Sequence, residues 1–221
     1  SNVTYLPAKG KSAPAAEVLA FDTGPGNMLM DGMMEQNSRH RMDRNGATAG
    51  RGKVNIELLK KLMRHPFVRQ APPKTTGREA FGQHFVLEVT RSAKQLGLRF
   101  QDTLATVTAF TAQSIAFNCR KFILPKTSLP AGRAGLAEVI VGGGGTKNAT
   151  LMAMLKEALA PVPVLTFEAF SMDSKAIEAM AFARLAYEAI LGTPNNLPSA
   201  TGARRSVVMG KIIPGSSFGL S

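Results

Sequence analysis

Apolar and polar residues recur along this chain with two different periods, which together predict strands that alternate with helices. Short apolar runs bounded by glycine, proline or polar residues indicate strands. They occupy residues 3–6, 17–21, 137–141, 162–167 and 206–210. Longer segments with apolar residues at helical spacing indicate helices. They occupy residues 28–36, 56–64, 103–122, 146–159 and 175–191. Such alternation is typical of the α/β class.

Local signals mark where some of these elements begin and end. Asn55 is a good N-cap for the helix at 56–64, and the pair His65–Pro66 ends it. Asp102 can cap the long helix at 103–122. Apolar residues cover more than one side of that helix, so we expect it to be buried on more than one side.

Composition predicts which segments are buried and which are exposed. The continuous apolar run at 137–141 is typical of a buried strand, and the alanine-rich helix at 175–191 is expected to pack tightly. Residues 36–53 are polar and basic and contain glycine, so we expect an exposed loop. Composition does not shift enough to mark a domain boundary, so residues 1–221 are treated as one domain.

The chain is strongly basic, which raises the question of a nucleic-acid partner. Its formal net charge is +12, from 27 lysines and arginines against 15 aspartates and glutamates. The basic residues are scattered, and aromatic residues do not interleave with them as a base-stacking platform requires. We therefore expect no nucleic-acid binding, and a charge that serves solubility and attracts small anions.

The sequence shows no sign of a membrane or secreted protein. No apolar run reaches the roughly 18 residues of a membrane-spanning helix. The first residues lack the basic segment and apolar run of a secretory signal. The single cysteine, Cys119, has apolar neighbours in the helix at 103–122, which predicts a buried, unreactive thiol. A reducing, cytoplasmic setting is the expectation.

A strand that runs into an aspartate and two glycines forms the first candidate site. The residues are Asp22, Thr23, Gly24, Pro25, Gly26 and Asn27. Glycines let a backbone approach a ligand closely, and a helix starting next would direct free N–H groups at an anion. Asp22 leaves the carboxyl end of the strand, where α/β sheets place ligands. The alternative is a tight turn in which Asp22 only bonds the loop backbone.

Four consecutive glycines form the second candidate site. Gly142, Gly143, Gly144 and Gly145 follow the strand at 137–141, and Asn148 comes shortly after them. Such a run is conformationally costly, which favours a ligand that needs the side chains to be absent, a flat base or a phosphate. The spacing matches neither the dinucleotide fingerprint nor a Walker loop.

Two further stretches contain polar residues of interest. Residues 72–79 hold two prolines and the polar side chains of Lys74, Thr75, Thr76, Arg78 and Glu79. A rigid polar loop of this kind can bind a sugar or a phosphate, or it can be a solvated loop in which Arg78 pairs with Glu79. Glu178 lies near the start of the helix at 175–191, where a carboxylate also suits the helix dipole.

No metal cluster or nucleophile–base pair is evident in the sequence. The histidines, His40, His65 and His84, do not have the spacing of metal ligands. We therefore expect no metal ion held by protein ligands alone.

Five segments together resemble the family of anhydro-N-acetylmuramic acid kinases, to which the fungal levoglucosan kinases are related. They are AFDTGPGNMLMD (20–31), HPF with PPKTTGRE (65–67 and 72–79), VGGGGTKN (141–148), EAMAFARLA (178–186) and NLPSATGA (196–203). They occur in the family's order and span nearly the whole chain.

The resemblance implies a fold and a reaction. The family belongs to the actin and sugar-kinase superfamily, so the expected fold is a ribonuclease-H-like domain with a mixed sheet flanked by helices. ATP lies between two such domains. Water attacks the anomeric carbon of a 1,6-anhydro sugar, the bridge opens, and the freed 6-oxygen takes the γ-phosphoryl group with Mg²⁺ assisting.

The resemblance also assigns roles to residues. Gly142, Gly143, Gly144, Gly145 and Asn148 would hold the adenosine side of the nucleotide. Asp22, Thr23, Gly24, Gly26 and Asn27 would lie near the phosphates and the sugar. Lys74, Thr75, Arg78, Glu79 and Glu178 are further candidates for the cleft.

This chain departs from the family pattern in what it lacks. The family's first phosphate loop and the aspartate expected to activate water are absent from it. Residues 1–221 are therefore expected to be the C-terminal, ATPase-like half of such a kinase, inactive alone and with the catalytic base in a missing first domain. Where the family tends to have a carboxylate, this chain has Lys175.

Other functions stay open at this stage. The chain can belong to a levoglucosan kinase, or it can be a non-catalytic nucleotide- or sugar-binding protein derived from a kinase. The sequence also leaves open whether the protein forms a homodimer.

Overall fold

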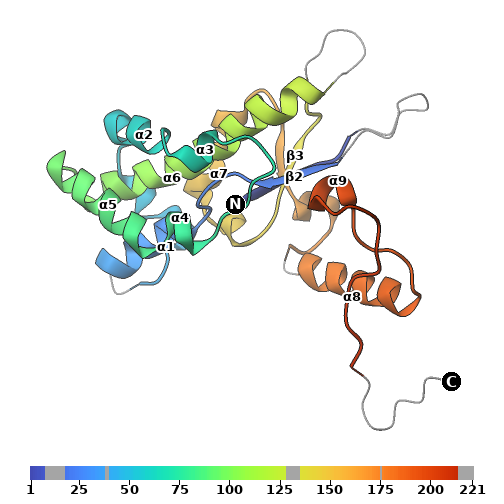
Figure 1. Ribbon diagram of the computed structural model, residues 1–221. Coiled ribbons are helices and arrows are strands. Elements are labelled where there is room, and N and C mark those ends of the chain that lie inside the picture. The colour runs from blue at the N-terminus through green and yellow to red at the C-terminus, as the bar shows by residue number, and fades with distance from the viewer. Residues whose placement is uncertain (8–17, 38–39, 128–134, 175, 214–221) are drawn as a thin grey trace.

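Helices dominate the structure, with short strands among them (Figure 1). The computed structural model describes residues 1–7, 18–37, 40–127, 135–174 and 176–213, so Lys175 lies outside the described residues. The longer helices are α1 (Met28–Asn37), α2 (Ile56–Leu62), α5 (Gln83–Gln95), α6 (Phe100–Asn118), α7 (Ala149–Leu159) and α8 (Ile177–Ile190). The shorter helical segments are η1 (Arg44–Gly46), η2 (Ala49–Arg51), α3 (Pro66–Arg69), α4 (Arg78–Phe81), η3 (Cys119–Ile123), η4 (Leu124–Lys126), η5 (Gly144–Lys147), η6 (Phe167–Phe170) and α9 (Pro198–Thr201).

The strands of the described part form two pairs. β1 (Asn2–Tyr5) runs antiparallel to β2 (Leu19–Asp22), and β3 (Val139–Val141) runs parallel to β4 (Val164–Thr166). Helix α7 connects the parallel pair, which confirms the α/β class. Within the described residues the pairs are separate and do not form one mixed sheet, so the ribonuclease-H-like arrangement stays a prediction.

Helix α6 is the centre of the hydrophobic core. Thirteen of its nineteen residues are buried, and it packs against α1, α2, α3, α7 and η2. Its sequence contains no glycine or proline that would interrupt the hydrogen-bond ladder. Phe110 contacts the rings of Phe81 and Phe85 at centroid distances of 6.3 and 6.5 Å. The prediction that this helix is buried on more than one side is confirmed.

The N-terminus of α6 differs from the prediction. The helix begins at Phe100, three residues before the predicted start, and Asp102 lies in its first turn instead of capping it. The Asp102 carboxylate pairs with the Arg99 guanidinium at 2.8 Å and accepts a hydrogen bond from the backbone N–H of Lys53 at 2.8 Å. These interactions lower the pKa of Asp102 to about 2, with the bond from Arg99 as the largest cause.

Cys119 follows the C-terminal end of α6. It is 1% exposed, and burial raises its pKa to about 11, which confirms the prediction of a buried thiol.

The segment predicted to be an exposed loop at 36–53 is mostly exposed in its described residues, but Asp43, Gly46 and Ala49 are buried, so the prediction is confirmed only in part. Asp43 is only 8% exposed, and its carboxylate accepts hydrogen bonds from the N–H groups of Thr48 (2.8 Å) and Ala49 (2.9 Å). The Thr150 hydroxyl on α7 donates to the carbonyl of Gly46 at 2.8 Å. The Asp43 carboxylate thus accepts bonds from two backbone N–H groups of this segment, and α6 and α7 pack against the segment.

Helix α5 lies in the stretch 80–101, to which the sequence analysis assigns no element. Its buried residues Phe85, Val86, Val89 and Ala93 have helical spacing and face α1 and the aromatic residues of the core. Because this spacing is typical of a helix, α5 could have been predicted from the sequence.

None of the helices in the described residues is long and apolar enough to cross a bilayer.

The last described segment is far less buried than predicted. No residue of α8 is buried, which contradicts the tight packing expected at 175–191. Thirteen of the eighteen exposed large apolar residues in the described part lie between Phe170 and Ile213. Figure 1 shows α8 set apart from the helices that surround α6. Two smaller differences are that 206–210 forms no strand and that Ile140 of β3 is 41% exposed.

The role of Asp43 leads to a stability prediction. Replacing Asp43 with alanine leaves two backbone donors without their acceptor, which we expect to lower the free energy of unfolding by about 1–3 kcal/mol. Asp43→Asn keeps one oxygen acceptor and should cost less. Urea titration monitored by circular dichroism measures both variants. An alanine variant as stable as the wild type would show that the carboxylate does not hold this segment.

Candidate functional site

The first candidate site is built at the carboxyl end of β2 by two segments distant in sequence. The Oδ2 atom of Asp22 accepts hydrogen bonds from the Thr75 hydroxyl at 3.0 Å and from the Thr76 backbone N–H at 2.8 Å. The backbone N–H of Asp22 donates to the carbonyl of Lys74 at 3.1 Å. The structure therefore joins the predicted stretches 22–27 and 72–79.

The turn from β2 into α1 lies tightly against α6. A Cβ atom on Gly24 would come within 2.6 Å of the Ser114 hydroxyl, so no larger residue fits without a shift. Gly26 has a φ of +60°, and its carbonyl accepts a hydrogen bond from Thr111 at 2.9 Å. Both glycines are thus required by the turn itself, and the close approach they allow here is to the protein.

The two glycine-containing stretches meet at Asn27. A Cβ atom on Gly145 would lie 3.3 Å from the Asn27 Oδ1, and one on Gly144 would lie 3.6 Å from the Asn27 Nδ2. Asn27 directly precedes α1, and Gly144 and Gly145 begin η5, which leads into α7. The sequence predicted each stretch separately, and the structure brings them into contact.

The four glycines meet different surroundings. A Cβ atom on Gly142 would meet the Phe167 ring at 2.6 Å, and Gly143 has a φ of +84°, a conformation that favours glycine. Gly144 is exposed and has neither restriction, so the fold does not require a glycine there. A requirement at Gly144 would come from a ligand.

Asn148 has a structural role. Its Oδ1 accepts a hydrogen bond from the N–H of Leu151 at 2.9 Å, which caps α7, and the residue is 9% exposed. Its side chain is therefore directed at the helix. The N-terminal ends of α1 and α7 both lie at this site, and each carries the partial positive charge of unpaired N–H groups. This arrangement favours an anion.

The structure does not place the other predicted cleft residues beside an open site. Lys74 is buried at 7% exposure, with its ammonium bonded to protein oxygens. Arg78 and Glu79 are exposed, and Glu79 accepts hydrogen bonds from Gly77 N–H and from Thr76. Backbone bonds from Glu79 itself and Gly77 lower the pKa of that carboxyl. Glu79 therefore bonds the backbone and side chain of its own loop. The ion pairs found among the described residues do not include one between Arg78 and Glu79.

Glu178 is exposed in the first turn of α8. The segment at 196–203, which follows α8 in the chain, contains α9, which packs against β2 and so lies near Asp22. Helix α8 itself is held to the remainder by few contacts, and no interaction of Glu178 with the Asp22 cluster is found within the described residues.

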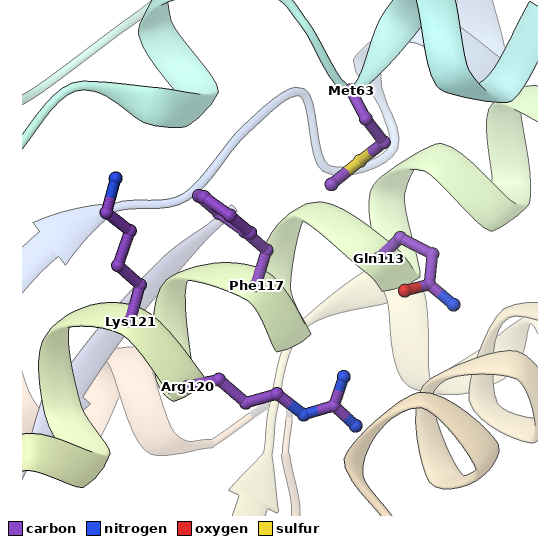
Figure 2. A pocket seen from close by; sticks show the side chains of 5 residues that line it. All are labelled: Met63, Gln113, Phe117, Arg120 and Lys121. Carbon is purple, nitrogen blue, oxygen red and sulfur yellow. The ribbon is translucent and has the colours of Figure 1, made fainter.

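Two cavities lie away from the candidate site. One of about 310 Å³ is lined by Met63, Gln113, Phe117, Arg120 and Lys121, as Figure 2 shows. None of the predicted site residues lines it. Among the residues that the structure describes, no three histidine, cysteine, aspartate or glutamate side chains gather as they would around a metal ion. Asp22 ends β2 shortly before Asn27, and its carboxylate is held by Thr75 and Thr76.

Comparison with known proteins identifies sequence relatives. The family model "Anhydro-N-acetylmuramic acid kinase" matches residues 1–215. A protein of that name from Clostridioides difficile is 42% identical over 213 residues, which cover 96% of this chain and 52% of the relative. One from Caldanaerobacter subterraneus and one from Bacillus cereus are 45% and 43% identical, each over 96% of this chain, and 51% and 53% of their own lengths are covered. The chain thus spans about half the length of the curated relatives it matches.

The glycines of the site lead to a prediction that needs no ligand. Gly24→Ala forces a methyl group against Ser114, so we expect it to lower the free energy of unfolding by about 1–3 kcal/mol. Gly144→Ala introduces only an ordinary contact with Asn27 and should change stability by no more than about 0.5 kcal/mol. Thermal and urea unfolding of both variants measure the difference. Equal losses in the two variants would contradict the packing described here.

Proposed function

This chain belongs to the anhydro-N-acetylmuramic acid kinase family, and we propose that it forms the nucleotide-binding wall of the active site of such a kinase. The substrates are ATP, water and a 1,6-anhydro amino sugar. Water adds to the anomeric carbon, the 1,6-bridge breaks, and the released 6-oxygen receives the γ-phosphoryl group, which leaves ADP and a sugar 6-phosphate. The site on this chain serves the nucleotide first, and the sugar at its edge.

The observation that carries this proposal is the contact of Asn27 with Gly144 and Gly145. It brings an exposed glycine segment and the N-termini of α1 and α7 together. Exposed glycines accommodate a flat base or a phosphate, and helix N-termini stabilise negative charge. A nucleotide has both a flat base and phosphates, whereas the sugar substrate has neither.

Asp22 is suited to assist the Mg²⁺ that accompanies ATP. Mg²⁺ is usually bound by one or two carboxylates together with substrate phosphates, so a full protein cage is not required. Both hydrogen bonds to the Asp22 carboxylate end on Oδ2, and Oδ1 has no protein donor among the described contacts. This carboxylate could therefore offer one oxygen to the ion, which would neutralise phosphate charge during transfer.

The exposed apolar surface of α8 supports the view that this chain is one half of the catalytic unit. Met180, Phe182, Tyr187 and Ile190 are between 56 and 73% exposed. A helix of this length gains most of its stability from packing, so the surface requires a partner. We assign as that partner the half of the family's polypeptide that this chain does not match, since the relatives are about twice as long.

A nucleotide-binding test follows from the geometry of Gly144. Gly144→Val should weaken the binding of Mg-ADP at least tenfold, because its side chain occupies the exposed surface next to Asn27 while the fold tolerates it. Gly144→Ala should have a smaller effect, and Thr193→Val, in an exposed loop elsewhere, should have none. Isothermal titration calorimetry gives the affinities, and melting curves check the fold. Wild-type affinity in a folded Gly144→Val protein would refute the assignment.

A reconstitution test addresses the division of the kinase. The chain alone should give no sugar 6-phosphate from Mg-ATP and 1,6-anhydro-N-acetylmuramic acid, because general-base catalysis alone contributes about 100- to 10,000-fold. Product should form when a polypeptide carrying the unmatched half of the family is added. Levoglucosan, tested in parallel, distinguishes the related sugar kinase from this one.

The same assay tests the assigned partner surface. Phe182→Asp and Ile190→Asp should abolish the gain in activity on mixing, because a charge on α8 cannot be buried against the partner without cost. Leu87→Asp, on the exposed side of α5, is the control and should leave the gain intact. Substantial turnover by the chain alone would show that the catalytic residues lie within it. Nucleotide binding without turnover in any mixture would favour a non-catalytic binding protein.

A further inference from the structure

Lys74 is a buried cation whose bonding capacity is fully used. Its Nζ donates to the carbonyl of Phe67 at 3.0 Å, to the carbonyl of Val68 at 3.2 Å and to the Oδ1 of Asn118 at 2.7 Å. An ammonium has three N–H donors, so donors and acceptors match in number. The rings of Phe67, Phe122 and Phe21 lie around it, with centroids at 4.8, 5.5 and 5.8 Å from Nζ.

Asn118 extends this network to the turn that follows β2. Its Nδ2 donates to the carbonyls of Ser114 at 2.8 Å, Thr23 at 3.3 Å and Val68 at 3.3 Å, and the residue has no exposed surface. The orientation of the amide is fixed, because its oxygen must face the Lys74 ammonium and its nitrogen must face carbonyls. Lys74 and Asn118 thus connect α3, α6 and the β2–α1 turn.

The main chain of Lys74 reaches the candidate site directly. Its carbonyl accepts the hydrogen bond from Asp22 N–H at 3.1 Å. The next two residues, Thr75 and Thr76, donate to the Asp22 carboxylate. Any movement of the Lys74 backbone therefore changes both the position of Asp22 and the donors that orient its carboxylate.

We propose that Lys74 is a positioning residue whose buried ammonium fixes residues 74–76 so that Thr75 and Thr76 hold the Asp22 carboxylate in a single orientation. The proposal deepens the proposed function, because it concerns the side chain assigned to Mg²⁺ and phosphate. The hydrogen bonds from Thr75 and Thr76 to Asp22 exist in the chain without any ligand, so the positioning role can be tested apart from nucleotide binding.

The energetics of Lys74 agree with a role in positioning. Burial, then the charge of Lys121, lower the pKa of Lys74 to about 8, and the charge of Asp22 opposes them. Lys121 lies in η3, which follows α6, and Asp22 lies at the end of β2, while α3 offers carbonyl oxygens and the Phe67 ring. An unfolded lysine keeps its proton to about pH 10.4. Between about pH 8 and 10.4 the folded state binds fewer protons, so this residue's contribution to the free energy of unfolding rises with pH.

Burying the charged form therefore does not stabilise the fold at neutral pH, and an apolar side chain could fill the same space. What the ammonium adds is three N–H donors for the three oxygens of Phe67, Val68 and Asn118. Replacing it with an apolar side chain removes all three bonds, so the positioning of Asp22 should weaken.

The experiment is NMR spectroscopy of the ligand-free chain at neutral pH, following the side-chain ¹³C signal of Asp22 and the backbone ¹⁵N signal of Thr76. The wild type should give one sharp signal for each, because the carboxylate has a single orientation. In Lys74→Met the oxygens of Phe67, Val68 and Asn118 lose their donors, so both signals should move and broaden or divide. Lys61→Met, which removes an exposed lysine bonded to Ser92 on α5, is the control and should match the wild type.

A conservative variant gives a second test. Lys74→Arg keeps a cation with N–H donors, so both signals should lie nearer to their wild-type positions than in Lys74→Met. If Lys74→Met does not fold, one signal each for Asp22 and Thr76 is the expected result in Lys74→Arg, and several signals would overturn the proposal. Wild-type signals in a folded Lys74→Met protein would also overturn it. Because no nucleotide is present, either result is separate from failure of the nucleotide assignment.

Discussion

The buried hydrogen-bonding groups of α6 are the constraint on which the arrangement of this molecule depends. Thr106, Thr108, Thr111, Ser114 and Asn118 have at most 1% exposed surface, and each needs a partner inside the protein. No buried side-chain nitrogen or oxygen among the described residues lacks one. Several of these partners belong to the helix's own preceding turn, but Thr111 and Asn118 bond the turn after β2. A core helix thereby fixes the backbone of the candidate site.

This constraint explains why the site is assembled from segments that are distant in sequence. The turn at 23–26 can lie against α6 only because Gly24 leaves room for Ser114. Once that turn is placed, α1 begins beside α7, and Asn27 reaches the glycines that precede α7. Lys74 bonds the same Asn118 and brings Thr75 and Thr76 to Asp22. The buried Asn118 therefore anchors both the turn after β2 and Lys74, and the glycine stretch is positioned through Asn27.

Local signals in the sequence predicted much of this structure. The periodicity of α6, the cap at Asn55 and the positions of the four strands in the described part follow from neighbours in the chain, so they could be predicted. The contact of Asn27 with Gly144 could not, since no local pattern indicates which loops meet. Lys74 was predicted as a cleft residue because its loop looks polar, and only the fold reveals that the ammonium points inward. The burial of Asp43 was hidden in the same way by basic and glycine neighbours.

Helix α8 shows a different limit of sequence reasoning. Its alanine-rich, apolar composition predicts a packed helix, yet all its residues are exposed or half-exposed. Composition predicts that a surface will be covered and does not say by what. This chain corresponds to about half of each relative, which is why we assign the other half as the partner of this surface. Two helix N-termini favour the binding of phosphates, as the proposed function requires. In the proposed kinase the base that activates water comes from the half that this chain does not match, and the exposed apolar residues of α8 are assigned to the contact between the two halves.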